Sequence, residues 1–381
     1  MRRELLRAEV VYNGFGTPRP DGAIVLQEGI GGACIVAVEG YQSARSGFPD
    51  AAVREVGFAL SPPPVNAHTH LDLSTMPYSP GPYEVFLEAV MHHHRSGGRS
   101  LAAAEAGVEA LLATGLGVVG DIVALDEVMR FLLAHPRLTG VAYWEVLEPD
   151  PEAADRVLAA TEERLRMYRR LERPGGVRVG LSPHTPHTVS APLLRRLAAL
   201  AIREGLPLQI HLAESPSEVA YHRDGSGPFG DLLAGYAPDW RPSGLTPVGY
   251  LRSLGVLEAR PTLVHMIQVV DEDVREVQRA GCVVVHCPRS NKALECGRFP
   301  WALYARHGVT VAFGTDSLGS SPSLSVEQEV AFARSWHGAE ASPLGLVRAA
   351  VKGGYRALRL TPPRLVRGDP AEGVYIWGRP C

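Results

Sequence analysis

Short apolar runs alternate with longer amphipathic segments along most of the chain, beginning after three consecutive prolines at residues 62–64. Eight runs are rich in Val, Ile and Leu, and they lie at residues 65–70, 117–122, 140–146, 177–182, 207–211, 261–265, 282–286 and 309–313. Runs of this length indicate buried strands, and the segments between them repeat apolar residues at helical spacing. The alternation predicts repeated βα units and a parallel sheet.

Two of the intervening segments carry clear helix signals. Residues 151–171 are charged on one face, and Asp150 before Pro151 is typical of an N-cap followed by proline at the first helical position. Residues 191–204 repeat Leu at helical spacing and end at Gly205, which predicts a C-cap. Eight strand–helix repeats over about 250 residues predict an α/β fold of the (β/α)₈, or TIM, barrel type.

Both ends of the chain differ from this central region. Residues 1–60 contain β-like apolar stretches separated by Gly and Pro, and residues 362–381 again contain a short β-like stretch, at 366–377. We therefore predict a barrel over residues 61–361 and a small second domain that both termini build.

Composition and charge exclude several classes of protein. The 381 residues carry a formal net charge of −3, which does not favour nucleic acid as a partner. No apolar run approaches the roughly 18 residues that a membrane span needs. The first residues lack the apolar stretch of a signal peptide, so a cytoplasmic location is expected. The five cysteines have no disulfide or zinc-ribbon spacing, and Cys282, Cys287 and Cys296 are expected to be small buried side chains.

The strongest candidate chemistry lies at residues 66–70 (NAHTH) and 209–214 (QIHLAE). His68 and His70 are two positions apart on a strand, so they face the same side and could begin a metal site. His211 ends the fifth run, and Glu214 lies three residues further on, where a general acid or base could reach a water beside a metal. The alternatives are incidental histidines and a surface glutamate near a helix start.

Two further candidates complete the set. His265 ends the sixth run and Asp316 follows the eighth; taken singly, they could be a buried histidine and a helix N-cap. Together with the other candidates they all fall at carboxyl ends of predicted strands, the face that carries barrel active sites. Three of these four histidines together with Asp316 would leave a coordination position for water, as catalytic metal sites do.

Four motifs resemble the metal-dependent amidohydrolase superfamily, and within it the aminohydrolase branch of nucleoside and nucleobase deaminases and chlorohydrolases. They are residues 66–71 (NAHTHL), 211–215 (HLAES), 286–297 (HCPRSNKALECG) and 314–318 (GTDSL). The resemblance implies a distorted barrel with a small β-sandwich domain built from both termini.

The resemblance also implies a role for each candidate residue. The metal ligands that it implies are His68, His70, His211 and Asp316. His265 would then stand beside the metal-bound water, Glu214 would be the proton shuttle, and Asp316 would share in catalysis. Binuclear relatives bridge two metals with a lysine on strand four, but residues 177–182 contain none. We therefore expect one divalent metal ion, Zn²⁺ or Fe²⁺.

The expected substrate is a small-molecule nucleoside. Residues 181–190 (LSPHTPHTVS) resemble a stretch of adenosylhomocysteine and methylthioadenosine deaminases, which implies that His184 contacts the nucleoside, although His187 stands where those enzymes have Tyr. Residues 63–70 and 315–324 look most like the aminodeoxyfutalosine deaminases of menaquinone synthesis. The expected reaction is hydrolytic removal of the 6-amino group of an adenine nucleoside.

Several alternatives stay open from the sequence. Within enzymes they are deamination of adenosylhomocysteine, methylthioadenosine, adenosine or guanine, or hydrolysis of chloride from a triazine. A metal-bound binding protein is the alternative from another class, and Glu214 argues against it because binding needs no proton shuttle. The oligomeric state is also open, with a homodimer as one alternative. His135, His222, His307 and His337 are expected at the surface or at caps.

Overall fold

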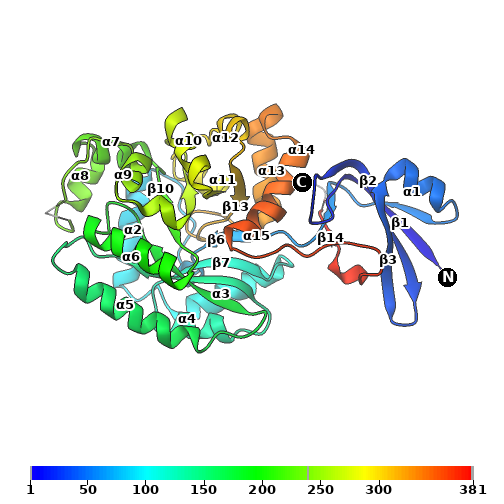
Figure 1. Ribbon diagram of the computed structural model, residues 1–381, viewed down its shortest axis with the longest axis horizontal. Helices are drawn as coiled ribbons and strands as arrows, with labels where there is room; N and C mark the ends of the chain where they lie inside the picture. Colours follow the sequence, from blue (N-terminus) through cyan, green and yellow to red (C-terminus); the bar gives the residue numbers. More distant parts are fainter. Residues whose placement is uncertain (1, 238–239, 379–381) are drawn as a thin grey trace.

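The computed structural model describes residues 2–237 and 240–378, which form two unequal parts (Figure 1). The larger part contains two parallel sheets with helices around them, and the smaller part is mainly a β-sheet. Residues 1, 238–239 and 379–381 lie outside the described residues, and they include Cys381 and the end of the predicted C-terminal segment.

The larger part is built on two four-stranded parallel sheets, with strand orders β6-β7-β8-β9 and β10-β11-β12-β13. Their bounds are β6 (Asn66–Thr69), β7 (Val118–Val123), β8 (Thr139–Val146), β9 (Val177–Pro183), β10 (Gln209–Leu212), β11 (Thr262–His265), β12 (Val283–His286) and β13 (Thr310–Phe313). Each strand coincides with one of the eight predicted runs. The prediction of parallel strands alternating with helices is therefore confirmed.

The two sheets meet at both of their edges. Isolated parallel bridges join Leu181 to Leu208 and Thr69 to Asp316. At the second junction the backbone N–H of Asp316 donates to the carbonyl of His68 over 3.1 Å. The carboxyl ends of β6 and β13 are consequently held next to each other.

Helices lie around these sheets and beyond the ends of their strands (Figure 1). They are α2 (Tyr83–Arg95), α3 (Leu101–Ala113), α4 (Asp126–Ala134), α5 (Ala154–Arg169), α6 (Ala191–Glu204), α7 (Pro216–Asp224), α8 (Pro228–Leu233), α9 (Pro247–Ser253), α10 (Asp271–Ala280), α11 (Pro288–Ala293), α12 (Trp301–His307), α13 (Val326–His337), α14 (Pro343–Arg348) and α15 (Gly354–Ala357). Within residues 2–237 and 240–378, no helix has both the length and the apolar character needed to cross a membrane.

Two helices test the predicted boundaries. Helix α6 has the predicted bounds and ends at Gly205, whose φ of 65° is the left-handed conformation that glycine adopts most easily. The predicted N-cap of α5 is wrong, because the helix begins at Ala154. The carboxylate of Asp150 instead accepts the backbone N–H of Glu152 over 2.8 Å, which forms a turn ahead of the helix.

The smaller part is a six-stranded sheet of order β14-β5-β1-β2-β3, with β4 also paired to β1. Its elements are β1 (Arg3–Val11), β2 (Arg19–Gly29), β3 (Gly32–Gly40), α1 (Tyr41–Gly47), β4 (Ala52–Glu55), β5 (Ala59–Ser61) and β14 (Tyr375–Ile376). Strands from both ends of the chain share this sheet, as predicted. The described residues form one sheet, however, and not the two facing sheets of the predicted sandwich.

The C-terminal segment departs most from its prediction. Of the β-like residues 366–377, only Tyr375 and Ile376 form a strand. Pro370 makes an isolated bridge with Cys34 at the opposite edge of the sheet. Gly368, Pro370 and Gly373 interrupt the apolar pattern, because proline cannot donate to a strand ladder and glycine weakens a strand interior.

Candidate active site

Five of the predicted site residues come together at the carboxyl ends of β6, β10, β11 and β13. The Nε2 atoms of His70 and His211 are 3.3 Å apart. The Oδ1 atom of Asp316 lies 3.5 Å from Nε2 of His70 and 3.6 Å from Nε2 of His68. His265 closes the group, with its ring centroid 5.8 Å from that of His68. All of these side chains are buried or nearly so.

Gln209 fixes the orientation of His68. The Oε1 atom of Gln209 lies 2.7 Å from Nδ1 of His68, and its Nε2 atom donates to the carbonyl of Ala67 over 3.1 Å. The amide oxygen is then the acceptor, so Nδ1 of His68 carries the hydrogen. Nε2 of His68 keeps its lone pair. It is buried and has no hydrogen-bond partner among the described residues.

The same arrangement recurs at two other histidines. Nδ1 of His211 lies 3.1 Å from the carbonyl oxygen of His184, and Nδ1 of His265 lies 2.9 Å from Oδ1 of Asn291. Each oxygen can only accept, so each Nδ1 donates, and the lone pair remains on Nε2. An imidazole whose other nitrogen is bonded in this way is the usual form of a metal ligand.

The electrostatics of the group suit a cation. Burial lowers the pKa of His70 to about 3 and the pKa of His211 well below its usual value, so both rings are neutral. Burial by itself would raise the pKa of Asp316, but its interactions with His68 and His70 hold that pKa well below the usual value. Neutral imidazoles around one ionised carboxylate, with an unpartnered Nε2 at the centre, fit a divalent metal.

Backbone geometry aims Asp316 at the histidines. Its φ is 64°, which is uncommon for a residue with a side chain. Its second oxygen, Oδ2, accepts hydrogen bonds from the hydroxyls of Ser290 (2.7 Å) and Ser320 (2.9 Å). Two residues earlier, a Cβ on Gly314 would lie 2.8 Å from Cβ of His68, so glycine is required there. Oδ1 of Asp316 is left to face the histidines.

Glu214 stands beside this group. Its Oε1 atom is 3.5 Å from Nε2 of His265. Burial and the negative charge of Asp316 raise the pKa of Glu214 to about 8. The carboxylate of Glu218 accepts the backbone N–H groups of Ala213 (2.9 Å) and Glu214 (2.7 Å), which holds the turn that carries Glu214. A protonated carboxyl group beside these histidines and Asp316 can act as a general acid.

His184 borders the same site. Its ring centroid lies 5.1 Å from that of His211. Its Nδ1 atom is 2.9 Å from the hydroxyl of Thr188. The structure therefore places His184 next to the histidine cluster, and its contact with a nucleoside stays a prediction.

Sequence reasoning missed the residues that orient the predicted ones. Gln209, Ser290, Asn291 and Ser320 had no assigned role, although Ser290 and Asn291 lie inside the motif at residues 286–297. The signal for Gln209 was its position two residues before His211 on one strand, which puts both side chains on the same face.

The expectation of a surface position is wrong for two histidines, although His337 does lie at a cap, at the start of the 3-10 helix Gly338–Glu340. His222 and His337 are buried, with 0% and 2% of their surface exposed, and not at the surface. His222 forms a second group of potential metal ligands with His187 and Glu218. The carboxylate of Glu218 is already bonded to backbone N–H groups, as described above. Aromatic side chains of neighbouring segments, Trp240 and Tyr250, lie against His222, and a local sequence pattern does not reveal such contacts.

The fold and this site together define a member of a known family. Residues 60–363 match the Amidohydrolase family, and the chain belongs to it. The predicted resemblance is thereby confirmed, and the chain is a hydrolase of carbon–nitrogen bonds, as expected. An aminodeoxyfutalosine deaminase of Deinococcus radiodurans is 46% identical over 98% of this chain and 90% of its own length. A 5-methylthioadenosine/S-adenosylhomocysteine deaminase of Nitratidesulfovibrio vulgaris is 27% identical over 93% of this chain and 79% of its own length.

Solved structures agree on the fold. Helicobacter pylori aminofutalosine deaminase, in complex with methylthio-coformycin, superposes with a TM-score of 0.74 at 21% identity and covers 97% of this chain and 90% of its own. An adenosine deaminase of Xanthomonas campestris with bound zinc has a TM-score of 0.69 at 25% identity, over 96% of this chain and 83% of its own.

Proposed function

We propose that this chain is a metal-dependent deaminase that removes the 6-amino group of 6-aminodeoxyfutalosine, a nucleoside of menaquinone biosynthesis. The observation that carries the proposal is the 46% identity to the Deinococcus radiodurans enzyme over 98% of the chain. The histidine, aspartate and glutamate side chains that such a reaction needs also converge here in one buried site.

In this proposal His68, His70, His211 and Asp316 hold one divalent metal ion, Zn²⁺ or Fe²⁺. The neutral imidazoles and the ionised carboxylate support this ligand set, and β9 offers no lysine that could bridge a second ion. The Xanthomonas campestris relative contains zinc. When bound, a divalent ion would act as a Lewis acid and lower the pKa of water toward about 7.

The side chains around the metal ligands move and direct protons. Glu214 holds a proton near neutral pH and donates it to ring N1, which makes C6 electrophilic. His265 and Asp316 orient the attacking water toward C6. The ionised Glu214 then accepts a proton from the attacking water, and Glu214 or Asp316 passes it to the amino group, which leaves as ammonia. The second proton of the water restores the protonated Glu214. His184 contacts the nucleoside.

We also infer that the two parallel sheets form one distorted eight-stranded barrel with its mouth at this site. The bridges at both sheet edges support the closure. The barrel explains how residues from β6 and β13, which are far apart in sequence, lie side by side.

The test is release of ammonia from a panel of 6-aminodeoxyfutalosine, adenosylhomocysteine, methylthioadenosine, adenosine and guanine. We expect the highest kcat/KM for 6-aminodeoxyfutalosine. A clear preference for another nucleoside would change the proposed substrate but leave the proposed deamination reaction in place. Absence of ammonia release from every compound, with metal bound, would overturn the proposal.

Deamination of methylthioadenosine or adenosylhomocysteine is the second candidate. It is favoured by the relatives from Nitratidesulfovibrio vulgaris, which match 93% of this chain. The motif at residues 183–187 (PHTPH) also resembles those enzymes, apart from His187. The same panel separates the two candidates.

A further inference from the structure

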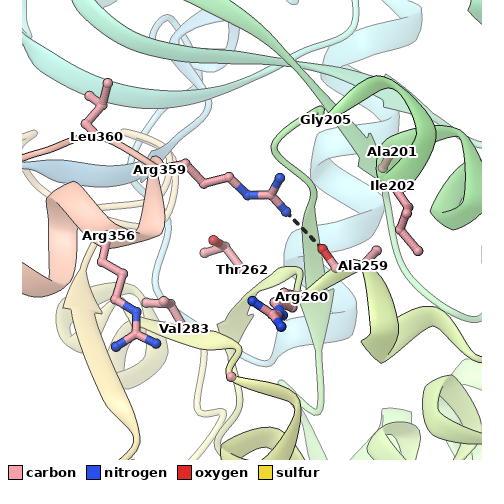
Figure 2. Close-up of a pocket in the computed structure, with 11 residues that line it drawn as sticks. Ala201, Ile202, Gly205, Ala259, Arg260, Thr262, Val283, Arg356, Arg359 and Leu360 are labelled. Carbon is pink, nitrogen blue, oxygen red and sulfur yellow. Dashed lines mark hydrogen bonds between the residues drawn. The ribbon is translucent and has the colours of Figure 1, made fainter.

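A cavity of about 550 Å³ opens at the end of the larger part that lies opposite the candidate active site. Its walls include the first residues of β11 and β12, Thr262 and Val283, whereas the active site lies at the carboxyl ends of the strands. Figure 2 shows three arginine side chains, Arg260, Arg356 and Arg359, around Thr262. The volume is in the range of small-molecule sites.

The three arginines line this cavity without any acidic residue. Arg356 donates to the hydroxyl of Thr310 over 3.0 Å, and Arg359 donates to the carbonyl of Ala259 over 2.9 Å. Neither bond neutralises charge. Within the part of the chain that the structure describes, none of the three forms an ion pair with a carboxylate. Many other arginines are paired, as Arg289 is with Glu329 at 2.6 Å.

The positive charges are close enough to affect each other. Burial lowers the pKa of Arg359, and the neighbouring charges of Arg178 and Arg260 lower it further. The guanidinium of Arg178 donates to the carbonyl of Leu358, the residue before Arg359, over 2.8 Å. Like charges gathered at a cavity are unfavourable in the free protein, and a bound anion would relieve this repulsion.

Two of these arginines also adopt an uncommon backbone conformation. The φ of Arg260 is 50° and the φ of Arg359 is 51°, in the left-handed region that disfavours side chains. Both residues stand at the end of a helix, Arg260 as the C-cap of the 3-10 helix Val256–Ala259 and Arg359 just after α15, where a left-handed residue is common.

Helix ends oppose the positive charge only in part. Helices α6 and α10 end beside the cavity at Gly205 and Gly281. Helix α15 also ends there, just before Arg359 and Leu360. Each helix C-terminus carries about half a negative charge, so three of them leave about half of the positive charge uncompensated.

We propose that this cavity binds a small organic anion. The guanidinium groups of Arg260, Arg356 and Arg359 would bind its carboxylate or phosphate, which they match in geometry. Its apolar part would lie on Ile202 and Val283, which line the same cavity. Ile202 is 54% exposed, so it offers apolar surface to a ligand.

The test uses the metal-loaded chain and two probes, inorganic phosphate and benzoate, each compared with sodium chloride at equal ionic strength. We expect at least one probe to raise the Tm of the wild type above the chloride value and to bind in isothermal titration. The probe that binds tells whether the site takes phosphate or carboxylate. The double variant Arg260→Gln/Arg359→Gln should weaken that binding by about tenfold or more.

The control double variant Arg19→Gln/Arg367→Gln removes the same charge from exposed positions in the smaller part of the molecule. It should bind the probe as the wild type does. Equal weakening in the control, or no binding of either probe to the wild type, overturns the proposal. If the Arg260→Gln/Arg359→Gln chain does not fold, Arg356→Gln provides the same comparison. All these variants should keep deaminase activity, because their residues lie outside the candidate active site.

Discussion

At the scale of single residues, Glu214 separates acid–base chemistry from metal binding. Glu214→Gln keeps the size of the side chain but cannot transfer a proton, so kcat should fall by about 10²–10⁴-fold. Metal content and fold should not change, because Glu214 is not one of the four proposed ligands. Ammonia release and elemental analysis on the same preparation measure both quantities.

Glu88→Gln is the matched control, because Glu88 is an exposed carboxylate on α2. It should retain full turnover. Loss of metal from Glu214→Gln would make Glu214 a ligand and contradict the assignment. Near-normal turnover would move the proton shuttle elsewhere, first to His265, which lies 3.5 Å from Glu214.

Gln209 should matter for metal affinity although it is not a proposed ligand. Gln209→Ala removes the oxygen that holds the hydrogen on Nδ1 of His68, at 2.7 Å. Loss of such a partner typically weakens metal binding by about 10–100-fold. Competition with a chelator of known affinity measures the change. His92→Ala, at an exposed position of α2, should leave the affinity unchanged, and an unchanged affinity in Gln209→Ala would reject the role.

The sequence was sufficient to predict which side chains converge in the buried site, but not those that orient them. His68, His211 and Asp316 each follow an apolar run, so their location at strand ends was predictable from pattern. The partner of His68 is 141 residues away, and the partners of Asp316 include Ser290, on a different element. Such contacts depend on tertiary packing, which one sequence does not encode as a local pattern.

At the scale of elements, the junction of β6 and β13 should tolerate no side chain at Gly314. A Cβ there would lie 2.8 Å from Cβ of His68 and 2.9 Å from Cγ1 of Val285. Overpacking of this kind costs about 1–3 kcal/mol, so Gly314→Ala should lower the free energy of unfolding by that amount. Urea unfolding measures it.

Turnover of Gly314→Ala should fall as well, because Asp316 follows two residues later. Gly47→Ala is the control, since a Cβ at the end of α1 would have no atom within 4 Å. Equal stability of the two variants would show that β6 can move away from β13, against the close approach described here.

Hydrophobic periodicity predicted the locations of the strands and helices closely. It predicted the residues at which they begin and end less well. The strands matched because parallel strands buried on both faces give continuous apolar runs. The start of α5 did not match, because Asp150 can bond either a helix or a turn, and the local sequence fits both. The C-terminal segment pairs with two edges of one sheet, a path that alternation of polar and apolar residues does not specify.

At the scale of the whole molecule, the metal should stabilise the fold. Its proposed ligands come from β6, β10 and the segment after β13, so one ion would tie the two sheets together. A ligand at 1,000 times its dissociation constant adds about 4 kcal/mol to the folded state. Chelation should therefore lower the Tm, and Zn²⁺ should restore it.

Elemental analysis should give one metal per chain before chelation and none after. The His68→Ala variant should show neither the metal nor the shift in Tm. Two metals at full occupancy would contradict the mononuclear site and direct attention to His187, Glu218 and His222. An unchanged Tm after proven metal loss would reject the stabilising role.

The smaller part should depend on the end of the chain for its stability. Trp377 is fully buried, its indole N–H donates to the hydroxyl of Ser61 over 2.8 Å, and its ring meets that of Phe58 edge-on at 5.9 Å. Trp377→Ala should lower the free energy of unfolding by about 3–5 kcal/mol, the usual cost of truncating a buried aromatic side chain. Urea unfolding followed by circular dichroism measures it.

Ile376→Ala, at a neighbouring side chain that is 40% exposed, should lower the free energy of unfolding far less. Because the contacts of Trp377 given above involve no proposed metal ligand, metal content should be the same in both variants wherever they remain folded. Equal losses in the two variants would mean that the C-terminal segment does not anchor this sheet.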